Sequence, residues 1–309
     1  MVLRLGTRGS PLALAQAAEV RARLVASDPA LAAPEAIAIV PIRTTGDRLT
    51  QGSLADLGGK GLFTKEIEEG LRAGTIDLAI HSLKDMETAL PAGLVIAAHL
   101  PRADPRDALV ARGGIGSVAA LPPGASVGTA SIRRRAQLLA QRPDLQIAPL
   151  RGNVGTRLTK LAAGEMAATV LALAGLARIG RTDCVSAVLS PEEMLPAVGQ
   201  GVIAVEARAD DARTLALLAP IDDAATAACA TAERAMLAAL DGSCRTPIAA
   251  LARIENGRLV LDAMVIRPDG GALHRTRREG APGEARTLGT DAGAELKARA
   301  GPGFFEASA

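Results

Sequence analysis

Val2-Leu3-Arg4-Leu5-Gly6-Thr7-Arg8-Gly9-Ser10-Pro11 carries the first signal of the fold. Residues 2–6 are typical of a short strand, and Ser10 followed by Pro11 is typical of a helix N-cap and the first helical position. The helix that follows would place four apolar side chains on one stripe, namely Ala13, Ala17, Val20 and Leu24. A strand that turns directly into a helix favours an α/β fold.

Strands and helices continue to alternate along most of the chain. Helices are predicted at about 62–72, at 131–141 and at 153–162. Further strands are predicted at 36–43, 76–80, 107–111, 126–129, 145–150, 167–173 and 202–207. This alternation predicts sheets of parallel strands that are covered by helices on both faces.

Residues 220–309 differ in character. A long Ala-rich helix is predicted at about 223–240 and a second helix near 290–299. Three strands are predicted between them, at 247–255, 259–267 and 272–279, with turns at Asn256-Gly257 and Asp269-Gly270-Gly271. We therefore expect an α/β protein that ends in a small α+β domain.

Composition argues against several kinds of protein. The net charge of +2 over 309 residues gives no reason to expect a nucleic-acid partner. No stretch approaches the roughly 18 consecutive apolar residues of a membrane helix, and the amino end does not resemble a secretory leader, so we expect a cytoplasmic protein without a membrane partner. The three cysteines form no CxxC pair and the three histidines are widely spaced, which indicates neither a disulfide framework nor a metal site.

The densest basic stretch covers residues 131–157, with six arginines and one acidic residue. Arg133 to Arg135 follow Gly128-Thr129-Ala130-Ser131 at a predicted strand-to-helix junction. Basic residues there oppose the helix dipole, which favours ligand binding over a solvated basic face. Arg151-Gly152-Asn153-Val154-Gly155 repeats the arrangement at the next strand end. Guanidinium groups match carboxylates and phosphates, so we expect an anion site at the carboxyl ends of these strands.

Nucleic acid is the weaker alternative for this basic stretch. Proteins that bind single strands combine basic residues with aromatic stacking platforms. The chain has only three Phe and neither Trp nor Tyr. We therefore expect no nucleic-acid partner.

Three other motifs carry reactive groups. Lys60 lies in a glycine-rich turn, Gly58-Gly59-Lys60-Gly61, that lacks P-loop spacing, so a solvated loop and a binding loop are equally open. In His81-Ser82-Leu83-Lys84-Asp85, Asp85 is a candidate for acid–base or cation-stabilising work, although on this motif alone an ordinary helix-start carboxylate is the better explanation. Arg245 favours the thiolate of Cys244, but an inert exposed cysteine fits that local sequence equally.

Eight stretches in this order resemble the porphobilinogen deaminase, or hydroxymethylbilane synthase, family. Each is modest by itself, but the ordered set is specific and spans nearly the whole chain. The stretches are Thr7-Arg8-Gly9-Ser10-Pro11-Leu12-Ala13, Gly58-Gly59-Lys60-Gly61-Leu62-Phe63, His81-Ser82-Leu83-Lys84-Asp85, Asp104-Pro105-Arg106-Asp107-Ala108, Gly128-Thr129-Ala130-Ser131-Ile132-Arg133-Arg134, Leu150-Arg151-Gly152-Asn153-Val154-Gly155-Thr156-Arg157, Leu195-Pro196-Ala197-Val198-Gly199-Gln200-Gly201 and Gly242-Ser243-Cys244.

The resemblance implies three domains. Residues 1–100 with 196–219 would form the first and residues 101–195 the second. These two would be alike, similar to periplasmic binding proteins, with the active cleft between them. Residues 220–309 would form the third domain, which would carry the cysteine.

The family reaction joins four porphobilinogen molecules head to tail, with loss of ammonia each time, and ends in hydrolytic release of hydroxymethylbilane. By resemblance, Cys244 would hold a dipyrromethane cofactor through a thioether. Asp85, as a buried carboxylate, would protonate the leaving amine and stabilise cationic pyrroles. The acetate and propionate groups would be held by Arg8, Ser10, Lys60, Ser82, Lys84, Thr129, Ser131, Arg133, Arg134, Arg151, Arg157 and Arg178.

The chain departs from the family pattern at Asp56, Glu87 and Ala130, which puts the fine positioning of ligand groups in doubt. A non-catalytic anion-binding protein of the same fold would explain the arginines but gives no role to Asp85 or Cys244. We therefore expect a monomeric cytoplasmic transferase with porphobilinogen as its small-molecule partner.

Overall fold

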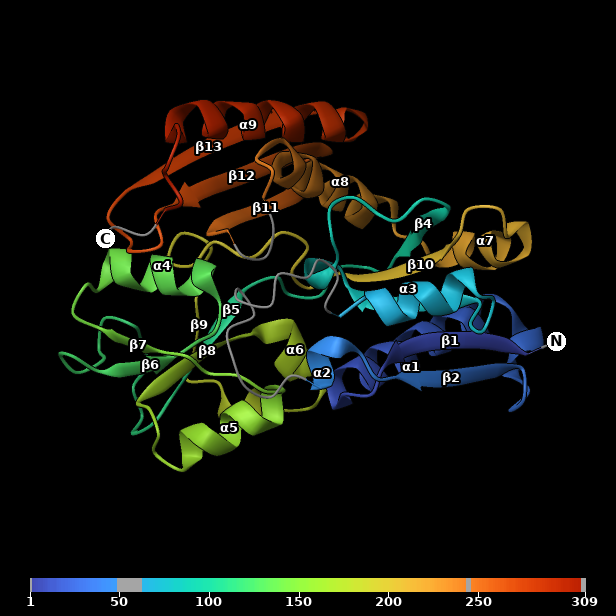
Figure 1. Ribbon diagram of the computed structural model, residues 1–309, viewed down its shortest axis with the longest axis horizontal. Coiled ribbons are helices and arrows are strands. Elements are labelled where there is room, and N and C mark those ends of the chain that lie inside the picture. The colour runs from blue at the N-terminus through green and yellow to red at the C-terminus, as the bar shows by residue number, and fades with distance from the viewer. Residues whose placement is uncertain (1, 49–62, 243–245, 307–309) are drawn as a thin grey trace. The chain divides into compact units, whose positions relative to one another are not determined.

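The computed structural model describes residues 2–48, 63–242 and 246–306 (Figure 1). The chain divides into two compact units. Unit 1 comprises Met1–Ala103 and Val202–Ala227, and unit 2 comprises Asp104–Gly201 and Ala228–Ala309. The chain therefore leaves unit 1, returns to complete it, and ends in unit 2.

Unit 1 is built on a five-stranded sheet in the order β2-β1-β3-β10-β4. The strands are β1 (Leu3–Arg8), β2 (Ile37–Ile42), β3 (Leu78–Ser82), β4 (Leu94–His99) and β10 (Ile203–Arg208). β10 runs antiparallel to its neighbours β3 and β4, while the other four strands share one direction.

Helices cover both faces of this sheet. Val20 and Leu24 pack with Leu5 on one face, whereas Ile67 and Leu71 pack with Ala79 on the other. The helical segments are α1 (Pro11–Ser27), α2 (Thr45–Arg48), α3 (Lys65–Arg72) and α7 (Ala212–Leu218), with single turns η1 (Pro29–Ala32), η2 (Leu83–Asp85) and η4 (Ala219–Ile221). Ser10 caps α1 as predicted, because its Oγ accepts a hydrogen bond from the Ala13 N–H at 3.2 Å.

The sheet of unit 2 repeats that of unit 1 strand for strand, in the order β7-β6-β8-β5-β9. Its strands are β5 (Asp107–Ala111), β6 (Ser126–Gly128), β7 (Gln146–Ala148), β8 (Ala168–Ala172) and β9 (Ala187–Val188). β5 is antiparallel to β8 and β9, as β10 is to its neighbours in unit 1. Two similar α/β sheets are therefore confirmed, but the expectation of purely parallel sheets was wrong.

The antiparallel strands have a physical cause in the path of the chain. β5 and β10 are the strands with which the chain enters each sheet from the other unit. Such a strand needs no helical crossover within its own sheet, so the rule that ties βαβ crossovers to parallel pairing does not apply to it.

Helices also cover both faces of the second sheet. Leu138 packs with Val127 on one face, and Leu158 and Leu161 pack with Leu171 on the other. The helical segments are α4 (Ile132–Gln141), α5 (Val154–Ala162), α6 (Leu173–Arg178) and the single turn η3 (Thr182–Cys184).

The carboxyl-terminal part is an antiparallel sheet with helices, as the sequence predicts. It contains α8 (Ala224–Ala239), β11 (Ile248–Glu255), β12 (Arg258–Ile266), β13 (Leu273–Gly280), η5 (Pro282–Glu284) and α9 (Ala285–Ala300). α9 lies along one face of this sheet (Figure 1). Gly289 in α9 faces the carbonyl oxygen of Ala232 in α8, so closely that a Cβ atom would overlap it. The opposite face packs Leu251 and Met264 against Ala136 of α4.

No single helix in the described part of the chain is long and apolar enough to cross a membrane. One bent pair, Ala212–Ile221 with Ala224–Ala239 at 105°, meets the length and composition criteria together.

Candidate functional site

A small pocket in unit 1 collects several residues that the sequence singled out. It has a volume of about 50 Å³ and lies where β1 and β3 end and α1 and η2 begin. Arg8, Ser10, Ser82 and Asp85 all line it. The carboxyl ends of neighbouring parallel strands meet at one sheet edge, which is why stretches far apart in sequence converge here.

Arg8 is held from two sides. Its Nε lies 3.2 Å from Oδ1 of Asp47, and its guanidinium stacks 4.2 Å from the ring centroid of Phe63. Asp47 also accepts a hydrogen bond from the Thr44 hydroxyl at 2.9 Å. Burial alone would raise the pKa of Asp47, but the hydrogen bonds and charge of Arg8 lower the pKa on balance. Arg8 is therefore a fixed cation whose orientation is set before any ligand arrives.

The two serines of the pocket are also positioned. The buried Gln16 donates from Nε2 to the Ser82 Oγ at 2.8 Å, and the Ser10 Oγ accepts the helix cap bond described above. Both hydroxyl oxygens are thus used as acceptors, which leaves their hydrogens available to donate.

Asp85 ends the η2 turn, which is tied to β10 because the Leu83 N–H donates to the Val202 carbonyl oxygen at 3.0 Å. Asp85 is exposed, so the expectation of a buried carboxylate was wrong. The turn carries the chain out of the sheet immediately after the buried strand, and this brings the side chain to the surface of the pocket. Within the described part of the chain, the Asp85 carboxylate forms neither a hydrogen bond nor an ion pair. Lys84 lies half-buried beside it in the same turn.

In unit 2 the predicted strand-to-helix junction is present. The Ser131 Oγ caps α4 by accepting from the Arg134 N–H, and the Thr129 Oγ1 accepts from the Ser131 N–H at 3.1 Å. Both residues follow β6 directly, at its carboxyl end. Their side-chain oxygens therefore shape the start of the helix.

Arg133 and Arg134 turn into the unit instead of toward solvent and are 5% and 6% exposed. Both bind the fully buried Asp107: Arg133 Nη2 donates to Oδ2, and Arg134 Nη2 donates to Oδ1, each at 2.7 Å. Gln200 Nε2 donates to the same Oδ1 at 3.0 Å. Burial would raise the pKa of Asp107, but the two guanidinium charges outweigh it and lower the pKa strongly.

This cluster carries one carboxylate against two guanidinium groups, so a positive charge is left over. The Nε of Arg133 is buried without a hydrogen-bond partner in the described part of the chain. A buried donor and an unmatched charge both favour an anionic ligand nearby. The cluster therefore fits an anionic group such as a carboxylate.

The other predicted arginines of unit 2 lie at helix ends. Arg151 follows β7, is half-buried, and forms no ion pair with the described residues. Arg157 Nε donates to the Gly152 carbonyl oxygen at 2.9 Å, and Arg178 Nη2 donates to that of Gly201 at 3.1 Å. Lys60 and Cys244 lie outside the residues that the structure describes.

The sequence analysis did not identify the two carboxylates, Asp47 and Asp107, that bind the predicted arginines of the site. Asp107 is the first residue of β5, at the start of its apolar run, whereas Asp47 lies much earlier in the chain, in unit 1. A charged residue at the start of a buried strand is a signal that could have revealed Asp107, because such a charge needs a partner. Asp47 lies in the short helix α2, within a polar stretch, and gave no such signal.

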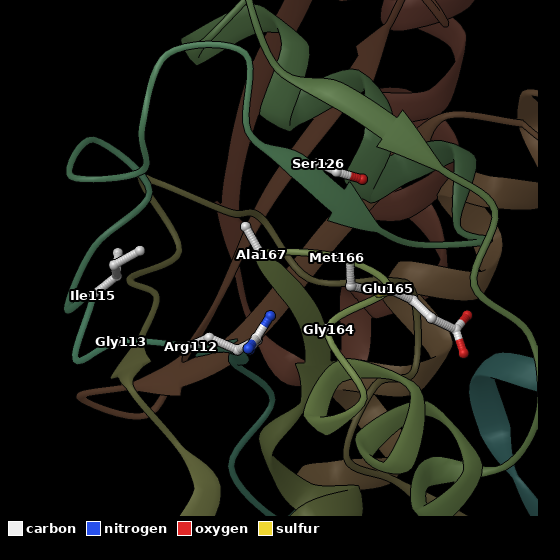
Figure 2. A pocket seen from close by; sticks show the side chains of 8 residues that line it. All are labelled: Arg112, Gly113, Ile115, Ser126, Gly164, Glu165, Met166 and Ala167. Carbon is white, nitrogen blue, oxygen red and sulfur yellow. The ribbon is translucent and has the colours of Figure 1, made fainter.

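A larger open pocket of about 500 Å³ lies elsewhere in unit 2 (Figure 2). It is found where β5 ends and where β6 and β8 begin, lined by Arg112, Ser126 and Glu165 among others. Figure 2 shows the Glu165 carboxylate pointing away from Arg112. None of the predicted residues lines it. In the described part of the chain, no group of three or more His, Cys, Asp or Glu side chains is arranged to hold a metal ion.

Two family models match the chain. Residues 3–216 match "Porphobilinogen deaminase, dipyromethane cofactor binding domain", and residues 227–298 match "Porphobilinogen deaminase, C-terminal domain". The chain belongs to the porphobilinogen deaminase family. Porphobilinogen deaminase from Paracoccus denitrificans is 53% identical over 304 residues, which cover 98% of this chain and 96% of the relative. That from Nitrobacter winogradskyi is 54% identical over 301 residues, with 97% and 94% covered.

Solved structures of other proteins are more distantly similar. The periplasmic aliphatic sulphonate binding protein SsuA from Escherichia coli is 18% identical, with a TM-score of 0.42, and covers 78% of this chain and 70% of its own. The Bordetella pertussis BvgS VFT2 domain is 14% identical, also with a TM-score of 0.42, and covers 71% and 86%.

Membership of the porphobilinogen deaminase family confirms the resemblance drawn from the eight stretches. The match to the dipyrromethane cofactor-binding domain also confirms the expected cofactor class. Among the described residues, the excess guanidinium charge beside Asp107 and the Arg133 Nε without a hydrogen-bond partner fit such an anionic group.

Proposed function

We propose that this chain condenses four porphobilinogen molecules into hydroxymethylbilane, with one ammonia released at each addition. The chain serves tetrapyrrole biosynthesis as a transferase. The observation that carries the proposal is the pocket of unit 1, which is lined both by Asp85, a carboxylate without a partner among the described residues, and by the pre-oriented cation Arg8. Family membership supplies the reaction that this pair would serve.

Asp85 is the catalytic residue of the proposal. Its carboxyl group hands a proton to the aminomethyl nitrogen of porphobilinogen, and its carboxylate then faces the cation that remains when ammonia leaves. Its lack of any partner in the described chain supports this role, because a carboxylate in an ion pair would already interact with another cation. Exposure to the pocket gives the substrate access.

The basic and hydroxyl side chains of both units bind the acetate and propionate groups. Guanidinium forks match carboxylates in pairs of hydrogen bonds, and each pyrrole ring brings two carboxylates. Arg151, half-buried and without an ion pair among the described residues, is the best supported of them. The proposed set is Arg8, Ser10, Lys60, Ser82, Lys84, Thr129, Ser131, Arg133, Arg134, Arg151, Arg157 and Arg178.

Cys244 is the proposed tether. A thioether to its sulfur would hold the dipyrromethane, which supplies the pyrrole carbon to which the first substrate is joined. The support is the Gly242-Ser243-Cys244 motif and the family match, since this cysteine lies outside the described residues. We also propose that the protein is cytoplasmic and that it acts as a monomer. Light scattering of the purified protein would check the monomer.

Intact mass spectrometry and turnover separate the parts of this proposal. The purified protein should exceed its sequence mass by one dipyrromethane, and Cys244→Ser should remove the excess. An active wild-type protein of unmodified mass would rule out the tether. Asp85→Asn should keep the mass excess and the melting temperature but lose nearly all turnover; unchanged turnover would remove Asp85 from the mechanism.

A further inference from the structure

A buried imidazole and a buried carboxylate face each other beneath the pocket of unit 1. Nε2 of His81 in β3 lies 3.2 Å from Oε2 of Glu206 in β10. His81 is 5% exposed and Glu206 is 0% exposed. The strand register explains the pairing: Ala204 lies opposite His81, so Glu206, two residues further on, occupies the diagonal position on the same sheet face.

Among the described residues, His81 is the only ion-pair partner of the Glu206 carboxylate. Neither of its carboxylate oxygens accepts a hydrogen bond there, and His81 Nε2 is likewise without a hydrogen-bond partner among the described residues. A buried carboxylate without donors or a counter-charge is strongly unfavourable. Among the described residues, His81 is therefore the group placed to supply a counter-charge, as an imidazolium ion.

A third titratable group interacts with this pair. Glu68 of α3 faces the same pair, and its pKa is raised, chiefly by burial and further by the charge of Glu206. A second carboxylate near the imidazole favours the imidazolium form.

The pair is connected to the candidate active site. His81 lines the same small pocket as Asp85 and Arg8, whereas Glu206 does not line it. The imidazole thus lies between the pocket and the buried carboxylate. A charge on His81 therefore lies in the lining of the same pocket as Asp85, whereas Glu206 is not among the lining residues.

We propose that His81 is an imidazolium ion held in that form by Glu206, and that its charge keeps the Asp85 carboxylate ionised between proton transfers. His81 and Glu206 are positioning residues, and the inference rests on the proposed role of Asp85. The charged groups that face His81 are Glu206 from β10, Glu68 from α3, and Arg8 and Asp85 at the pocket.

The first test reads the charge of His81 directly. Long-range nitrogen–proton NMR spectra distinguish imidazolium from either neutral tautomer, and the chain has only three histidines, so His81→Asn assigns the signal. The wild-type holoenzyme should show imidazolium shifts for His81 at pH 7, and Glu206→Gln should show a neutral ring. A neutral His81 in the wild type would overturn the inference without touching the role of Asp85.

The second test reads the effect on Asp85. The limb of the kcat–pH profile that belongs to Asp85 is the one that moves in Asp85→Glu. A nearby cation favours a carboxylate, so its loss in Glu206→Gln should shift this limb upward by about one pH unit. Glu206→Asp retains the charge and should leave the limb near its wild-type position.

Matched variants separate the charge effect from a loss of packing. Asp77→Asn removes a half-buried carboxylate that binds Arg4 at 2.7 Å, at the other end of the same sheet, and should lower stability without moving the limb. If Glu206→Gln, Glu206→Asp and Asp77→Asn all moved the limb equally, the effect would be structural and the inference would fail. If Asp85→Asn retained full turnover while His81 proved to be charged, the proposed function would fail and the buried ion pair would stand.

Discussion

Asp107 Oδ2 lies 2.7 Å from Nη2 of Arg133, and both side chains are almost fully excluded from solvent. The same carboxylate holds Arg134, so one residue compensates two buried cations. Removing one member of a buried ion pair costs far more than the pair itself contributes, because the other charge stays behind without a partner.

Asp107→Asn should therefore lower the free energy of unfolding by about 3–5 kcal/mol, since two buried guanidinium groups lose their counter-charge. Urea denaturation followed by circular dichroism would measure the change. Asp144→Asn removes an exposed carboxylate that pairs with Arg142 of the same unit and should change stability little. Equal losses of unfolding free energy in the two variants would show that the buried Asp107 contributes no more to stability than an exposed carboxylate.

The Arg8–Asp47 pair predicts how stability responds to acid. Arg8 lowers the pKa of Asp47 in the folded protein, so the native state binds fewer protons than the unfolded chain. The resulting stabilisation is present above the unfolded value of about 4 and is lost as the pH falls through the lower folded value. Asp47→Asn should therefore flatten the decline of the unfolding free energy below about pH 4.

Urea titrations at a series of acidic pH values would reveal this flattening. Asp210→Asn, at an exposed carboxylate of the same unit with no partner in the described chain, serves as the control. A decline as steep in Asp47→Asn as in Asp210→Asn would show that Arg8 does not stabilise the ionised form.

Arg8→Lys should weaken substrate binding more than it slows turnover. Lysine keeps the charge but loses the planar fork and the stacking on Phe63, which lies 4.2 Å away. Loss of one charge-assisted hydrogen bond corresponds to a rise in KM of about tenfold. Arg4→Lys, on the same strand but paired with Asp77, should leave KM unchanged. A KM that rises equally in both variants would argue against contact between Arg8 and substrate.

Gly289→Ala should destabilise the protein, although alanine is the better helix former by about 1 kcal/mol. The new methyl group would meet the Ala232 carbonyl oxygen, and separating α8 from α9 should cost about 1–3 kcal/mol. Gly283→Ala, where the added atom meets nothing within 4 Å, is the control and should be neutral. Thermal melts compare the two, and a stabilised Gly289→Ala would show that the helices separate freely.

The sequence predicts local structure well wherever one signal dominates. Ser10 and Pro11 mark the start of α1, and the apolar run of β5 was placed with its observed bounds, Asp107–Ala111. β4, β9, α6 and α7 were not predicted. β9 has only two residues, and β4 follows a turn without the helix that normally separates strands in an alternating pattern.

The candidate site was predictable as a set of residues but not as a set of contacts. The arginines after β6 were identified by position, yet their partner Asp107 lies on another strand, and no local pattern links the two. The exposure of Asp85 likewise depends on how η2 leaves the sheet. Periodicity reports which residues share an element, whereas these contacts depend on which elements become neighbours.

β10 lies between β3 and β4, although it follows the entire sheet of unit 2 in the chain. During synthesis, all five strands of the second sheet leave the ribosome before the fifth strand of the first sheet, β10, exists. The amino-terminal sheet is therefore the later one to be completed, and its closure waits on a contact of long sequence separation, which slows folding. Until Ile203–Arg208 arrives, β3 and β4 have open edges, and a nascent or truncated chain that ends earlier would be prone to aggregate through them.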